Sequence, residues 1–340
     1  MMSTMVSESL GLPCWCSPVI LAGTAYPGDI VFVRYNTVYV IVRRLYGDTY
    51  LAIPKYIRGL GPWRTVISGQ LKRIITTYSP RSIHGAAALA GAKLEKTPQF
   101  STNVPIVKLS DSDLLLCTTR PPLSPLELLE AERIAPGVWS QVYRFLNELA
   151  DCVKPTGSLL QGSFTSFSDV DLIVDISRPR CLSKLVEFME YMQYRSRSPP
   201  TADIVVVSEA SERNIPVELV RRLLRPWTKL SIEGRRVSLS IADFNARLEP
   251  LRVIVETSKV IVDKVVDVEP YQQTLGDFPA IAVTNDGSYI VIYDGLFVPL
   301  VFEGGKLRVR GLKACLKKGD ECLDAIVIGV REVATFIDIA

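Results

Sequence analysis

Two aspartates that alternate with apolar residues constrain this chain more than any other feature. Asp169 and Asp171 lie in the run Ser-Asp-Val-Asp-Leu-Ile-Val, whose β-branched and aliphatic residues favour a strand. Side chains on a strand alternate between its faces, so both carboxylates should point the same way, about 7 Å apart. Such oxygen ligands suit hard divalent cations, and magnesium binds through one or two carboxylates together with substrate phosphates.

A glycine–serine pair precedes the aspartates. Gly157 and Ser158 are followed by Gly162, and Ser168 stands directly before the first aspartate. Glycine lets the backbone approach an anion closely, and residues 159–161 are expected to begin a short helix whose free N–H groups face that anion. The sequence therefore predicts a metal-dependent triphosphate site, with the Ser158 hydroxyl donating to a phosphate oxygen.

The types and spacing of these residues resemble the signature of the DNA polymerase β-like nucleotidyltransferases, particularly the minimal archaeal and bacterial ones. The resemblance covers roughly residues 146–176 and extends more loosely to about 243, which is less than half of the chain. It implies that Asp169 and Asp171 bind catalytic magnesium or manganese. It also implies that the Gly157-Ser158 loop, with Gly162 and Ser168, holds a nucleoside triphosphate.

The resemblance calls for a third carboxylate, on a strand after the next helix, and here alternatives stay open. A helix is expected over 181–195, then a strand over 202–207 that carries Asp203, our candidate third ligand and general base. Glu218 competes, although the residues before it favour a first-turn helix charge. Asp243, after a strand-like run, is the remaining alternative.

Basic residues near the motif are candidates for binding phosphate. Lys154 precedes the glycine–serine pair, and the stretch 217–236 concentrates arginines, among them Arg221 and Arg222. Arginine suits bidentate phosphate contact. A solvated helix face explains the arginines equally well.

The predicted fold class is α+β, with a central polymerase β-like nucleotidyltransferase domain at 121–267. An N-terminal β-rich domain at 1–120 and a C-terminal antiparallel β domain at 268–340 flank it. The pattern favours a helix within 82–96 and leaves 251–268 open between strand and helix. Turn signals in the C-terminal part separate expected strands at 280–284, 288–293, 296–302 and 307–309.

Basic and aromatic residues interleave in the N-terminal β-rich domain, as a surface for single-stranded nucleic acid requires. They are Arg43, Arg44, Lys55, Arg58, Arg64, Lys72 and Arg73, with Tyr46, Tyr50, Tyr56 and Trp63. RNA is therefore an expected partner besides the triphosphate. Strands often carry aromatics and solvated charges, so the alternative of an ordinary sheet surface remains.

Composition sets broad limits. With 340 residues, 48% hydrophobic content and a net charge of +3, the chain is long enough for two or three ordered domains. No secretory signal or long apolar run is evident, so we expect a cytoplasmic protein without a membrane partner. Seven cysteines without zinc-like spacing argue against a structural zinc and a disulfide framework. Scarce Asn and Gln indicate a thermophile, in which case Cys315 and Cys322 could pair.

The function expected from these observations is transfer of a nucleoside monophosphate from a nucleoside triphosphate to a hydroxyl acceptor. Two metal ions would assist, and pyrophosphate would leave. The alternative is a protein of this fold with weak or absent turnover that binds RNA or a protein partner. The acceptor, the preferred base and the oligomeric state are not specified by any motif.

Overall fold

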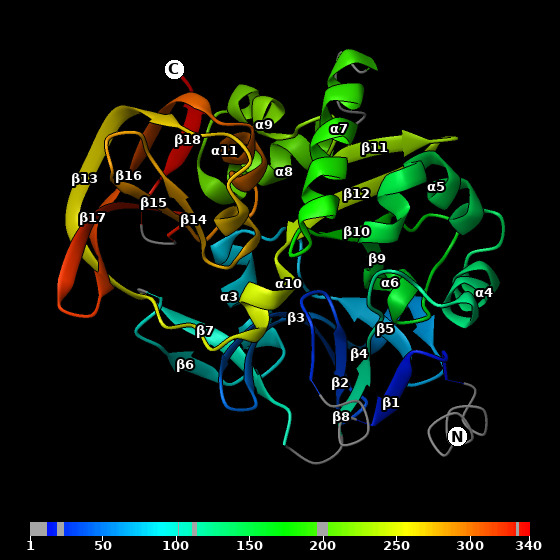
Figure 1. The fold of residues 1–340 in the computed structure, drawn as a ribbon. Helices are drawn as coiled ribbons and strands as arrows, with labels where there is room; N and C mark the ends of the chain where they lie inside the picture. The colour runs from blue at the N-terminus through cyan, green and yellow to red at the C-terminus, as the bar shows by residue number, and fades with distance from the viewer. Residues whose placement is uncertain (1–11, 19–23, 101, 111–113, 196–202, 331–332) are drawn as a thin grey trace.

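The computed structural model describes residues 12–18, 24–100, 102–110, 114–195, 203–330 and 333–340. Three β-sheets and a set of helices make up this part of the chain, which is a mixed α+β fold. In Figure 1 the N-terminal sheet, blue to cyan, lies below the green central sheet. The C-terminal sheet, yellow to red, lies to their upper left.

The N-terminal sheet has eight strands, which pair antiparallel in the described part of the chain, and the segment is β-rich as expected. Helix α3 (Pro80–Leu89) packs on it and ends before the predicted limit, because 94–96 form a strand. The strands are β1 (Cys16–Pro18), β2 (Ile30–Val33), β3 (Thr37–Tyr46), β4 (Thr49–Thr65), β5 (Gly69–Arg73), β6 (Leu94–Lys96), β7 (Asn103–Lys108) and β8 (Leu114–Cys117).

The central sheet carries the aspartate pair and has the order β11-β12-β10-β9. Strands β10 and β12 are parallel, whereas the other two pairs are antiparallel. The strands are β9 (Val153–Thr156), β10 (Val170–Asp175), β11 (Lys229–Ile232) and β12 (Arg235–Ala242). The surrounding helices are α4 (Pro125–Ile134), α5 (Val138–Leu146), η1 (Asn147–Cys152), α6 (Gly157–Leu160), α7 (Pro179–Arg195), α8 (Asp203–Arg213), α9 (Val217–Leu223) and α10 (Phe244–Leu248).

The two faces of strand β10 differ in character. Val170, Leu172 and Val174 are buried in a core that includes Trp139 of α5 and Leu185 of α7. Burying such side chains supplies about 1.5–3 kcal/mol each. The apolar face therefore anchors the strand on its helices, and the aspartates are left on the opposite face.

The predicted strand at 202–207 is wrong, because residues 203–207 form the start of helix α8. Val206 and Ala210 are buried one helical turn apart, while Ile204 and Val207 are 79% and 52% exposed. Helical packing of one face has overridden the strand preference of β-branched residues. The strand that lies parallel to β10 is instead β12.

The C-terminal sheet has the order β13-β16-β17-β15-β14, with β18 on β16. The segment left open at 251–268 forms strand β13, whereas the strand expected at 296–302 is wrong. Those residues include helix α11 (Val298–Glu303), and Pro299 occupies its first turn, where proline is well tolerated. The other elements are β13 (Ile254–Val268), η2 (Gln273–Gly276), β14 (Ala280–Val283), β15 (Tyr289–Ile292), β16 (Gly305–Lys318), β17 (Glu321–Ile328) and β18 (Phe336–Ile339).

The cysteines correct a third expectation. Six of them form the disulfides Cys16–Cys117, Cys152–Cys181 and Cys315–Cys322, and Cys14 is free. The expectation against a disulfide framework was therefore wrong, although the Cys315–Cys322 pair is confirmed. The first pair is separated by 101 residues. Only the folding of β1 onto β8 brings it together.

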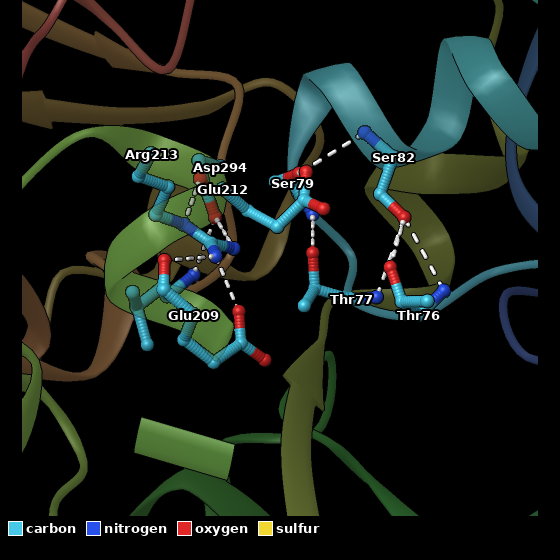
Figure 2. Close-up of polar contacts among 9 residues, drawn as sticks. Thr76, Thr77, Ser79, Ser82, Glu209, Glu212, Arg213 and Asp294 are labelled. Carbon is cyan, nitrogen blue, oxygen red and sulfur yellow. Dashed lines mark hydrogen bonds and ion pairs between the residues drawn. The ribbon is translucent and has the colours of Figure 1, made fainter. Parts of the chain in front are cut away.

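A buried charge network joins the central helices to the flanking sheets (Figure 2). Arg213 of α8 donates to both oxygens of Asp294, at 2.6 and 2.9 Å, and also pairs with Glu209. The side chains of Arg213 and Asp294 are 5% and 1% exposed. Ser79, the N-cap of α3, donates to Glu212 at 3.4 Å. Helix α8 therefore contacts elements of both other sheets.

None of the helices in the described part of the chain combines the length and the apolar content that crossing a membrane requires.

We predict that replacing Arg213 destabilises the fold strongly. Arg213→Met leaves the Asp294 carboxylate buried without its partner, which should cost about 3–5 kcal/mol in the free energy of unfolding. Arg222→Met is the matched control, because Arg222 forms a similar two-bond pair with Asp338 but is 49% exposed. Its loss should cost at most about 1 kcal/mol. Urea unfolding measures both, and equal costs would contradict the buried network.

Candidate functional site

Asp169 and Asp171 lie on one face of the central sheet. Asp171 stands in β10 opposite Ser238 of the parallel strand β12, and Arg236, on the same face of β12, contacts Asp169. The aspartate side chains are 38% and 33% exposed. Both carboxylates are therefore open to solvent from the same side.

The glycine–serine bend lies directly against this pair. Gly157 begins helix α6 with a φ of 62°, in the left-handed region that favours glycine. A Cβ atom at this position would collide with the Asp171 carboxylate. Both the backbone conformation and the close approach of the carboxylate therefore favour glycine at this position.

Ser158, Gly162 and Ser168 shape the loop between the bend and the aspartates. The Ser158 carbonyl accepts from the Ser163 N–H at 2.9 Å, and Gly162 has a φ of 72° where the short helix ends. The Ser168 hydroxyl accepts from the Thr165 N–H at 3.0 Å and so closes the turn that leads into β10. The Ser158 side chain is largely buried, at 5% exposure for the residue.

Two cations from the chain contact the aspartates. Arg236 Nε lies 2.8 Å from Asp169, and Lys55 Nζ lies 3.5 Å from Asp171. Burial raises the pKa of Asp169, while Arg236 opposes the rise and Asp171 adds to it. Burial alone would lower the pKa of Lys55, but its neighbours Tyr78 and Asp171 raise it overall. Lys55 therefore stays charged at neutral pH.

Aromatic rings surround Lys55. Its ammonium lies 5.7 Å from the ring centre of Tyr56 and 5.8 Å from that of Tyr78. Trp63 lies 5.3 Å from Tyr56 and 6.1 Å from Phe167, measured between ring centres. Strand β4 of the N-terminal sheet thus brings both cationic and aromatic groups to the aspartates.

Sequence reasoning placed Lys55 and Trp63 in a basic and aromatic surface but did not connect them with the aspartates. More than a hundred residues separate Lys55 from Asp171 along the chain, and the Lys55–Asp171 contact depends on how the two sheets dock. Phe167 carried no signal beyond its place before Ser168. Arg236 was noted among the arginines of 217–236, but its partner was not predicted.

Three of the predicted phosphate-binding cations are engaged elsewhere. Lys154 is fully buried in an ion pair with Asp29 of the N-terminal sheet. Arg221 pairs with Glu218 of the same helix, and Arg222 pairs with Asp338 of β18. These ion pairs direct the three cations to carboxylates other than Asp169 and Asp171.

The candidates for the third carboxylate are dispersed. Asp203 begins helix α8, and its side chain lies outside the described residues. The Glu218 side chain is 75% exposed on α9. Asp243 caps α10, where it accepts from the Ala246 N–H at 2.9 Å. Asp243 follows the far end of β12, about 20 Å along the strand from Arg236, so it does not join the aspartate pair.

The donor set suits magnesium without a third protein carboxylate. Among the described residues, no three His, Cys, Asp or Glu side chains gather as a metal cluster. Magnesium commonly keeps several waters and binds through one or two carboxylates plus substrate phosphates. Asp169 and Asp171 meet that requirement, although a metal ion would have to compete with Lys55 and Arg236.

A cavity of about 130 Å³ lies apart from the aspartates, beside the Arg213 network. Arg81 of α3, Asn214 and Thr335 contribute to its walls. Glu212 and Asp294 line it as well, so its charges are of both signs. None of the proposed site residues lines this cavity.

We predict that Lys154 is structural. Lys154→Met should cost about 3–5 kcal/mol of unfolding free energy, because Asp29 would remain buried without a partner. The double variant Asp29→Leu/Lys154→Met should recover much of that loss. Lys229→Met is a matched control that removes a 2.9 Å bond to the Ser238 hydroxyl, at a cost of about 1 kcal/mol. Urea unfolding tests this, and a Lys154→Met protein of unchanged stability would contradict it.

In comparisons with known proteins, no protein-family model, no curated protein and no solved structure matches the chain. The function is therefore inferred from the geometry of the site and from the resemblance of its motif.

Proposed function

We propose that the protein transfers a nucleoside monophosphate from a nucleoside triphosphate to a hydroxyl group of an acceptor. One observation carries the proposal: Asp169 and Asp171 share an open face of the sheet, with the Gly157 bend against Asp171. The resemblance assigns metal binding and triphosphate binding to these positions.

Asp169 and Asp171 would hold magnesium or manganese. When bound, the metal would supply positive charge that stabilises the charge developing on the phosphates. The carboxylates lie at the edge of solvent, so a metal–triphosphate complex has access to them. This arrangement agrees with the donor preference of a hard divalent cation.

The cations of the chain have a role in the same proposal. Lys55 and Arg236 would turn from the aspartates to the phosphate oxygens once a metal occupies the carboxylates, and arginine can contact phosphate through two parallel bonds. The acceptor oxygen forms a bond to the α-phosphorus, and the bond to the bridging oxygen breaks. Pyrophosphate leaves with that electron pair, and the hydroxyl proton passes to solvent water.

A second candidate is a nucleotide-binding protein without turnover. The ion pairs Lys55–Asp171 and Arg236–Asp169 favour it, because protein cations already neutralise both carboxylates. In that case the triphosphate would bind through Lys55 and Arg236, and no labelled acceptor would form.

We predict that the Asp169→Asn/Asp171→Asn double variant loses transfer by at least about 100-fold, since it removes charge at the reacting phosphates. The assay incubates the protein with magnesium, each α-labelled nucleoside triphosphate in turn, and a mixture of RNA and protein extract. Asp324→Asn is the matched control, because Asp324 is an exposed carboxylate on β17. It should retain full activity.

Equilibrium dialysis of the same labelled triphosphates separates the two candidates. Labelled product with the wild-type protein supports transfer. Triphosphate binding without product, in both the wild type and the double variant, supports the second candidate instead. Neither product nor binding with any triphosphate would overturn both.

A further inference from the structure

All charged residues between positions 49 and 94 are basic. The segment contains no aspartate or glutamate and seven basic residues, namely Lys55, Arg58, Arg64, Lys72, Arg73, Arg81 and Lys93. The whole chain, by contrast, has 39 basic and 36 acidic residues. Since the excess is local, this segment forms a positive region on an otherwise nearly neutral protein.

Strands β4 and β5 each expose cations, and Arg64, opposite Gln70, shares a face of the hairpin with Lys72. Arg58 and Arg64 of β4 and Lys72 of β5 are exposed, and the two strands pair in this region. In the described part of the chain, none of these three side chains forms an ion pair. Surface cations without acidic neighbours remain available to an external anion.

Accessible aromatic rings lie between this hairpin and the aspartates. Phe167 is 55% exposed and Tyr78 is 41% exposed. The Phe167 ring packs beside Trp63 of β4, with 6.1 Å between ring centres. Phe167 is also two residues before Asp169. The cationic surface and the aspartate pair are thus joined by rings that can stack with planar groups.

The geometry points to a single-stranded nucleic acid as the partner of the β4–β5 hairpin. Arg58, Arg64 and Lys72 contact backbone phosphates, and Phe167 and Tyr78 stack with bases. A strand is favoured over a duplex because stacking needs unpaired base faces, and over an anionic membrane because membranes offer no such planar groups. Lys55, which is buried on the same strand as Arg58, lies 3.5 Å from Asp171, so the β4–β5 hairpin begins beside the aspartate pair.

A further part of the inference is that the bound single-stranded nucleic acid is the acceptor, and this part rests on the proposed function. The terminal hydroxyl of the nucleic acid would attack the α-phosphorus in the reaction described above. Binding and transfer are measured separately, so that failure of one is distinguished from failure of the other.

Binding is measured by fluorescence anisotropy in EDTA, without triphosphate, using fluorescein-labelled uridine RNA, thymidine DNA and a duplex of the same length. We expect both single strands to bind more tightly than the duplex. The triple variant Arg58→Ala/Arg64→Ala/Lys72→Ala should weaken binding about 10-fold. It should also lower the slope of log K against log salt by about 2.

Each matched control removes the same number of positive charges, or one aromatic ring, from a surface away from the β4–β5 hairpin. Lys259→Ala/Lys306→Ala/Lys313→Ala changes three exposed lysines of the C-terminal sheet and should leave binding unchanged. Phe167→Ala should weaken binding roughly 10-fold, whereas Tyr194→Ala, at a position 94% exposed on α7, should not. Circular dichroism verifies that each variant is folded.

Equal weakening by the two triple variants would overturn the proposal, because it would indicate non-specific charge attraction. Tighter binding to the duplex, or to phosphatidylserine vesicles, would also overturn it. Addition of magnesium and labelled triphosphate then tests the acceptor step. If the nucleic acid binds but does not become labelled, the binding surface is supported, whereas its role in presenting an acceptor is contradicted.

Discussion

Charged groups on the polar face of the central sheet need partners, since a buried charge without one costs several kcal/mol. The N-terminal sheet meets this need in two reciprocal contacts. Asp29, which directly precedes β2, forms an ion pair with Lys154 of β9. In return, Lys55 of β4 forms an ion pair with Asp171 of β10. Docking of the two sheets therefore places Lys55 beside Asp171.

The docking of the two sheets gives Lys154 and Lys55 roles opposite to those that their positions along the chain suggest. Lys154 lies three residues before Gly157, yet its ammonium forms a buried ion pair with Asp29. Lys55 is far away in sequence, yet it stands beside Asp171 with the rings of Tyr56 and Tyr78 around it. The Lys55–Asp171 contact also brings the β4–β5 hairpin next to the candidate site.

The sequence predicted the parts of the fold in which local patterns agree with packing. The helix expected over 181–195 is confirmed, since α7 spans Pro179–Arg195. The strands predicted at 202–207 and 296–302 were wrong, because the strand-forming residues 203–207 and 298–302 belong to helices. In both segments, burial of one helical face or the favourable place of a proline outweighed local preference. The disulfide Cys152–Cys181 was missed because separation along the chain does not report distance in space.

For the candidate site, the sequence alone determined that Asp169 and Asp171 would share a face and that a glycine bend would precede them. These features depend on strand alternation and on backbone conformation, which are local properties. Only the tertiary structure decided that Lys55 and Arg236 contact the aspartates, that Asp243 lies at the far end of its strand, and that Lys154 is buried. Such relations arise when elements distant in sequence pack together, because the pairing of charges depends on the register and docking of whole sheets.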